Sequence, residues 1–127
     1  MFSRVISRPL YLFKELQNRR RLREITRRVA EEEAYKPGEK PVVFFNASTR
    51  LNHISMNAAF SSIIAWGFRL SGIPVAHFVC HAGMSRCVLG SDPDNHLQVP
   101  PCAGCVSQSE RLYAQADAHW FEYEEDG

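Results

Sequence analysis

All four cysteines of the chain fall within one segment of 26 residues: Cys80, Cys87, Cys102 and Cys105. The last two have the Cys-x-x-Cys spacing with which a tight turn directs two thiolates toward one metal ion. Six residues separate the first two, so only half of the usual two-knuckle pattern is present. A nearby histidine could replace a missing ligand: His77, His81 or His96. We predict a tetrahedral zinc site on the four cysteines, with an iron–sulfur cluster on the same ligands as the alternative.

Two other interpretations of the cysteines stay open. A Cys-x-x-Cys pair at a helix N-terminus has a lowered thiol pKa, which would suit a thiol redox protein. Here the pair follows a loop of about 20 residues instead of leaving a strand directly, which disfavours that interpretation. Alternatively, the four thiols are reduced and unconnected. No secretory signal is visible, so reduced thiols or bound metal are favoured over structural disulfides.

A polar loop at residues 46–50 is the second candidate site. It follows an apolar run and offers an amide, two hydroxyls and a guanidinium: Asn46, Ser48, Thr49 and Arg50. Next to a helix N-terminus, such groups suit an anionic or sugar ligand, and we predict that they bind substrate. The alternative is that they cap the helix and bond the loop to itself. There is no Gly-x-Gly-x-x-Gly string and no P-loop, so nothing indicates NAD or ATP.

The pattern along the chain predicts helices alternating with apolar strands. Helices are expected at residues 9–35, 55–71 and 103–117, and strands at 41–46, 73–80 and 118–123. Ser55 and Gly72 are suited to begin and end the second helix, which we expect to be buried. The continuous apolar runs indicate strands buried on both faces of a parallel sheet. We therefore predict an α/β fold: a basic helical arm and linker at 1–40, then a β-α-β-α-β Rossmann-like half-domain at 41–127.

The arm and the body differ in charge. Residues 1–40 hold eleven Lys and Arg against six Asp and Glu, whereas residues 41–127 hold four against eight. The arm could contact an anionic membrane surface through residues 1–30, contact nucleic acid, or be a solvated helix with Glu–Arg pairs. Aromatic residues interleaved with the arginines are missing, so we expect no nucleic acid. We expect a cytoplasmic protein, with contact at the inner face of the membrane as a possibility.

Five strings along residues 41–123 resemble a known group of proteins. They are FFNASTRL at 44–51, NAAF at 57–60, AWG at 65–67, GMSRCVLG at 83–90 and PCAGC at 101–105. They are similar to the N-terminal region of bacterial glycosyltransferase-like proteins of surface or capsular polysaccharide assembly. The resemblance implies a GT-B architecture, in which two Rossmann-like domains enclose the active site.

In that architecture the N-terminal domain binds the acceptor and the C-terminal domain binds the nucleotide-sugar. The resemblance therefore implies an acceptor-side domain that needs a nucleotide-sugar-binding second domain or partner chain, and that is inactive in sugar transfer alone. It identifies no catalytic residue. A basic, apolar arm would suit an enzyme that meets lipid-linked acceptors at the membrane.

Overall fold

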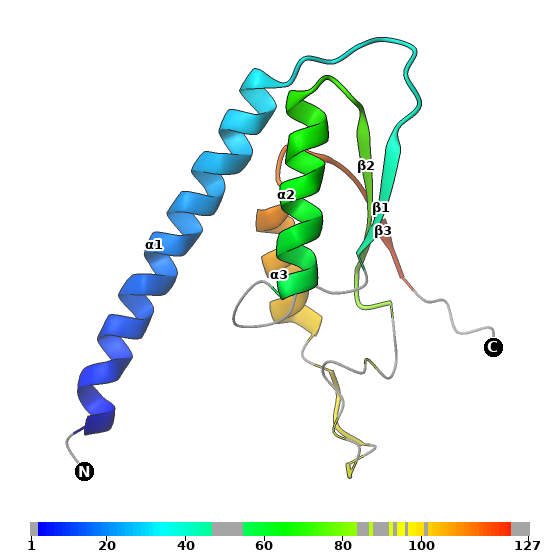
Figure 1. The fold of residues 1–127 in the computed structure, drawn as a ribbon. Coiled ribbons are helices and arrows are strands. Elements are labelled where there is room, and N and C mark those ends of the chain that lie inside the picture. Colours follow the sequence, from blue (N-terminus) through cyan, green and yellow to red (C-terminus); the bar gives the residue numbers. More distant parts are fainter. Residues whose placement is uncertain are drawn as a thin grey trace.

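The structure, a computed structural model, describes residues 3–46, 55–83, 87, 92, 94–95, 97–100 and 102–122, with side chains from residue 9 onward. Three helices alternate with three strands (Figure 1). The helices are α1 (Ser3–Glu32), α2 (Met56–Leu70) and α3 (Cys102–Leu112), and the strands are β1 (Val42–Asn46), β2 (Val75–Cys80) and β3 (Asp117–Phe121). The predicted α/β fold, a helix followed by a Rossmann-like half-fold, is confirmed.

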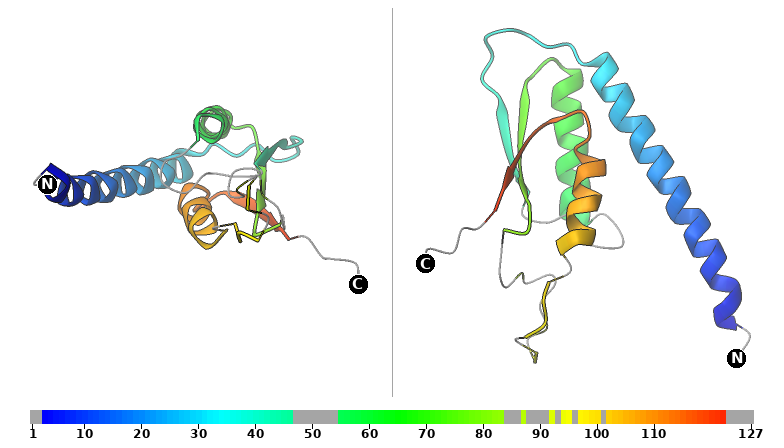
Figure 2. Two further views of the ribbon diagram at one scale, coloured as in Figure 1. Left: turned by 90° about the horizontal axis from the view of Figure 1, so that it is seen from below. Right: turned by 180° about the vertical axis from the view of Figure 1, so that it is seen from behind.

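The three strands form one parallel sheet in the order β1-β2-β3. The central strand, β2, pairs with β1 through Phe44 and with β3 through Ala118, both opposite His77. Because the strands are laid down in chain order, α2 and α3 pack on the same face of the sheet, and α1 lies outside them (Figure 2). No described element covers the opposite face.

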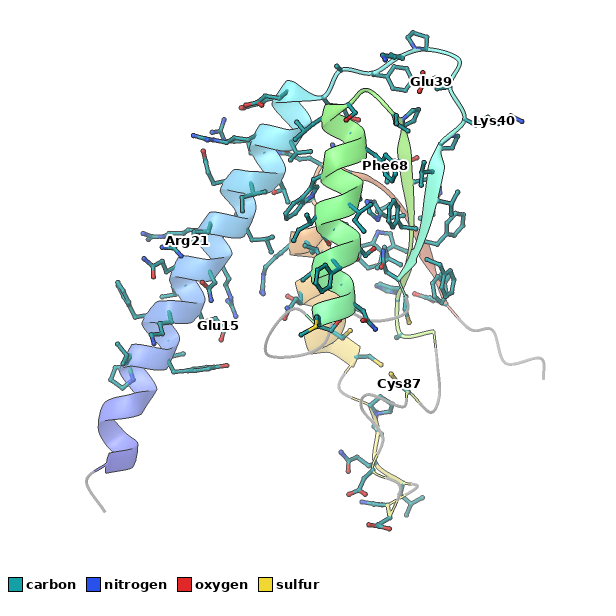
Figure 3. All side chains as sticks on the ribbon, viewed as in Figure 1. Glu15, Arg21, Glu39, Lys40, Phe68 and Cys87 are labelled. Carbon is teal, nitrogen blue, oxygen red and sulfur yellow. The ribbon has the colours of Figure 1, made fainter. Side chains whose placement is uncertain are left out.

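The core lies between the sheet and its two helices. Val79, in the central strand, is 1% exposed and packs with Ala58 of α2 and with Leu112 and Tyr113 at the end of α3. The ring of Phe68 points from α2 toward the sheet, where it meets Phe44 at a centroid distance of 6.3 Å (Figure 3). Small residues on α2 bring that helix close to the strands: Ala58, Ser62 and Ala65, all buried.

The ends of α2 confirm two sequence predictions. The Ser55 hydroxyl accepts a hydrogen bond from the Ala58 backbone N–H at 3.1 Å, which is the N-cap geometry. Gly72 follows the helix with a φ of +82°, the left-handed conformation that glycine adopts with little cost.

The long helix α1 contacts the body with only its C-terminal half. Thr26 and Val29 are buried, and Leu22 packs against the core. Toward its N-terminus α1 diverges from the body (Figure 1), and Phe13 and Leu16 are exposed. α1 is thus one unbroken helix of which only the C-terminal half packs on the body. No helix in the described part of the chain combines the length and apolar character needed to cross a bilayer.

Two sequence predictions about burial and one about a boundary are wrong. β1 is not buried on both faces, because Val43 and Phe45 point to the uncovered face and are 57% and 69% exposed. The second helix is not buried either: Phe60 is 60% exposed, since the buried residues of α2 are Ala58, Ser62, Ala65 and Arg69, and Phe60 lies on the outer side of the helix. The first helix begins at Ser3 and not at the expected residue 9, so Pro9 lies inside it.

A largely buried ion pair joins α2 to Glu33, the residue that follows α1. Arg69 of α2, 4% exposed, donates to the Glu33 carboxylate at 2.7 Å and to the Gln115 carbonyl at 2.9 Å.

Replacing Arg69 by Met should lower the free energy of unfolding by about 3 kcal/mol, because a partly buried carboxylate loses its partner. Urea unfolding followed by circular dichroism measures this. The exposed pair Arg28–Glu24 is the matched control, and Arg28→Met should leave the unfolding midpoint nearly unchanged.

Candidate metal centre

Three of the four cysteines lie in elements that end or begin at the carboxyl end of the sheet. Cys80 is the last residue of β2, and Cys102 is the first residue of α3, with Cys105 one turn further on. Because α3 runs back along the sheet, its first turn lies at the end where β2 finishes (Figure 1). Cys87, from the intervening connection, lies beside that turn (Figure 3). The fold thus gathers residues that are far apart in the sequence.

The pKa of Cys102 is sensitive to the other three cysteines. Burial raises the pKa of the Cys102 thiol, and the neighbouring Cys87, Cys80 and Cys105 raise it further. Cys102 therefore senses the charge of each of the other three sulfurs. Neighbouring thiolates repel one another, and a bound cation would compensate that repulsion.

The turn after β2 holds the Cys80 sulfur in place. Ala82 adopts a φ of +56°, and the chain folds back so that the Gly83 backbone N–H donates to the Cys80 sulfur over 3.2 Å. A side chain at Gly83 would be crowded, because an added Cβ would lie 3.2 Å from Phe121 of β3, which would have to shift by a few tenths of an ångström. A backbone N–H that donates to sulfur stabilises a thiolate. Metal ligands in proteins commonly receive such hydrogen bonds from surrounding groups.

The described side chains do not form a metal coordination sphere. Within residues 3–46, 55–83, 87, 92, 94–95, 97–100 and 102–122, no group of three or more His, Cys, Asp or Glu is arranged to hold a metal ion. Two of the histidines considered as substitutes have other partners: His81 pairs with Glu122, and His77 lies in the core. His96 lies outside the described residues.

The predicted substrate loop is described only at its first residue. Asn46, 9% exposed, turns toward the helices, where its Oδ1 accepts from the Ser61 hydroxyl at 3.0 Å. Its Nδ2 lies 3.5 Å from His77 Nδ1. The amide thus takes part in an internal polar network. Ser48, Thr49 and Arg50 lie outside the described residues, and substrate binding by this loop stays a prediction.

His77 is a buried polar residue whose place in this network the sequence did not indicate. It is 3% exposed in the central strand, with its ring 5.6 Å from Phe44 and 4.7 Å from Tyr113 between centroids. Burial, and secondarily the charge of Arg69, lower its pKa to about 4, while Asp117 opposes the shift. Burial also raises the pKa of Tyr113 to about 12. Both side chains are neutral near pH 7.

Because His77 is buried and neutral, we expect the free energy of unfolding to fall in mild acid. Between pH 6.5 and about 4 the unfolded chain binds a proton at His77 that the folded chain does not, so stability falls as pH falls through that window. The slope should be about 1.4 kcal/mol per pH unit, giving about 3 kcal/mol in total. Urea unfolding at several pH values measures it. In His77→Phe this part of the slope should vanish, and an unchanged slope would contradict the assignment.

Comparisons with known proteins do not assign the chain to a family. No protein-family model matches it, and neither the curated proteins nor the solved structures contain a significant match.

Proposed function

We propose that this chain is a metal-binding module in which Cys80, Cys87, Cys102 and Cys105 together hold one zinc ion. The observation that supports the proposal is the placement of the cysteines: Cys80 ends β2, Cys102 and Cys105 lie in the first turn of α3 at the same end of the sheet, and Cys87 lies beside that turn (Figure 3). Four sulfur donors are the usual set for a structural zinc site, and an iron–sulfur cluster uses the same set.

The role of the ion would be structural. It would join the end of β2 to the start of α3 and order the connection between them, which is long for a compact domain. When bound, zinc would supply the positive charge that lets four neighbouring thiolates coexist. Cys80 already has the Gly83 N–H as an outer partner.

The electrostatics favour metal binding over the thiol redox interpretation. A reactive Cys-x-x-Cys thiol owes its nucleophilicity to a lowered pKa. At Cys102, which begins α3, burial and the three other cysteines act in the opposite direction and raise the pKa. A thiol in this setting is a weak nucleophile and gains most from a cation.

Cobalt(II) titration tests the coordination directly. Cobalt bound by four thiolates in a tetrahedral field gives intense sulfur-to-metal charge-transfer and visible bands. The reduced, metal-free chain should develop these bands up to one equivalent of cobalt, and added zinc should bleach them. No band, or an end point far below one equivalent, would refute the four-cysteine site. A chain isolated brown, with acid-labile sulfide, would assign an iron–sulfur cluster instead.

A second candidate function is the acceptor-side domain of a glycosyltransferase-like protein of surface polysaccharide assembly. The Rossmann-like half-fold favours it, as does the loop that starts at Asn46 beyond the carboxyl end of β1, where such folds bind ligands. In this role the chain would need a nucleotide-sugar-binding domain or partner chain for transfer.

Titration followed by amide NMR tests this second candidate. A lipid-linked saccharide, presented in detergent micelles, should shift the amides of Asn46 and Ser61 at the carboxyl end of β1, and empty micelles are the control. A nucleotide-sugar alone should shift nothing, because its binding belongs to the other domain. Equal shifts with empty and loaded micelles would contradict an acceptor site.

A further inference from the structure

The outer face of α2 carries an apolar seam with a coiled-coil spacing. Its members follow one another at intervals of four, three, four and three residues: Met56, Phe60, Ile63, Gly67 and Leu70. This is the a/d pattern with which one helix packs along another. All five are exposed; the four large side chains keep between 45% and 74% of their surface in solvent. Ile64 flanks the seam and is 51% exposed.

The seam also lacks the charges that keep a helix surface in water. Arg69 is the only ionisable residue of α2, and it is buried against Glu33 on the other side of the helix. The seam of a second copy would therefore meet no like charge. A helix face that is apolar and uncharged over four turns is typical of a face covered by another helix.

The sizes of the side chains indicate which helix fits. A twofold axis through Ile63 would lay two α2 helices antiparallel and place Phe60 of each copy near Gly67 of the other. Space is open above Gly67, because an added Cβ there would meet no atom within 4 Å. Phe60, the largest residue of the seam, thus faces Gly67, the smallest, at two symmetry-related positions. A parallel pair would set phenylalanine against phenylalanine and leave a void at the glycines.

The area is sufficient for a reversible dimer. The four large side chains of the seam and the flanking Ile64 are each about half exposed or more, and together they offer on the order of 500 Å² of apolar surface per copy. A symmetric pair would therefore remove about 1,000 Å² from water, which is at the lower end for specific interfaces. We propose that two copies of this chain associate through an antiparallel α2–α2 seam, with Phe60 seated over Gly67 of the partner copy.

Sedimentation velocity over a wide range of concentrations, under reducing conditions, tests the proposal. The wild-type chain should pass from monomer to dimer as concentration rises. Gly67→Met fills the space that Phe60 occupies and should weaken the dimer at least tenfold, although methionine favours the helix more than glycine does. The Gly67→Met monomer should therefore be as stable to unfolding as the wild-type monomer, and this result would distinguish loss of association from loss of structure. Ile63→Glu, which brings two charges together at the axis, should abolish the dimer.

The matched control is Phe13→Ser on α1, which removes an exposed apolar side chain, 63% exposed, that is not part of the seam. It should leave the dimerisation constant unchanged. A wild-type chain that is monomeric at every concentration, or a dimer indifferent to Gly67→Met, would overturn the proposal. So would a monomer that binds vesicles of anionic phospholipid and loses that binding in Ile63→Glu, because the occupant of the seam would then be lipid.

Discussion

The Cys87→Ser variant should lose most of its zinc affinity and, with the metal, much of its stability. Cys87 is the sulfur contributed by the connection between β2 and α3, so without it zinc can no longer fasten that connection. Structural zinc contributes on the order of 10 kcal/mol to small domains that depend on it. Even a site only partly coupled to folding gives about 4 kcal/mol when free zinc is a thousand times its dissociation constant. Thermal unfolding of both proteins in zinc buffers measures the difference.

The control for this prediction is the same pair of proteins in excess chelator. Without metal, Cys87→Ser removes only a partly exposed thiol, so the two unfolding midpoints should nearly coincide. A difference that appears only with zinc assigns the effect to coordination. Equal stability of the two proteins in saturating zinc would show that Cys87 is not a ligand.

Gly72→Ala should be among the most destabilising single substitutions in the chain. Two costs combine at this residue: its φ is +82°, and an added Cβ would lie 2.4 Å from the Ala34 carbonyl oxygen. That oxygen belongs to the linker after α1 and is backbone, so the end of α2 and the linker would have to separate. We expect a loss of about 2–4 kcal/mol in the free energy of unfolding, measured in urea.

Gly38 is the matched control for Gly72. Its φ of +91° is equally unfavourable for alanine, but nothing lies within 4 Å of an added Cβ. Gly38→Ala should therefore cost only the conformational part, about 1 kcal/mol. If both variants lose the same stability, the close approach between Gly72 and Ala34 contributes nothing.

The elements of this fold could be predicted from local signals because each carries its own. Ser55 supplies the cap of α2, Gly72 ends it, and the apolar runs have the length of strands. The placement of Cys80 and Cys102 at the same end of the sheet also follows from topology, since in a parallel β-α-β unit each helix begins at the end where the preceding strand finishes.

What lies on each face of an element could not be predicted in the same way. An apolar run looks the same whether a helix of the same chain or a second molecule covers it, so Phe45 and Phe60 were expected to be buried. The partners of His77 also depend on register: strand pairing and helix packing bring Asn46, Phe44 and Tyr113 around it from three elements. No spacing within β2 encodes those neighbours.

Two of the apolar surfaces in the described structure differ in whether they indicate a partner. One, on α2, is a seam with regular spacing and complementary sizes, and for this reason supports a specific partner. The other is the uncovered sheet face, where Phe45 stacks on Phe121 at 5.2 Å and Phe78 on His119 at the same distance. Aromatic pairing across the strands stabilises that face locally, which is consistent with its partial exposure.

Elemental analysis combined with thiol titration of the chain, purified without added metal or chelator, tests the central claim most directly. The four-cysteine site predicts about one zinc per chain and thiols that react slowly until a chelator removes the metal, after which all four react. A chain with no bound metal and four freely reactive thiols would contradict it.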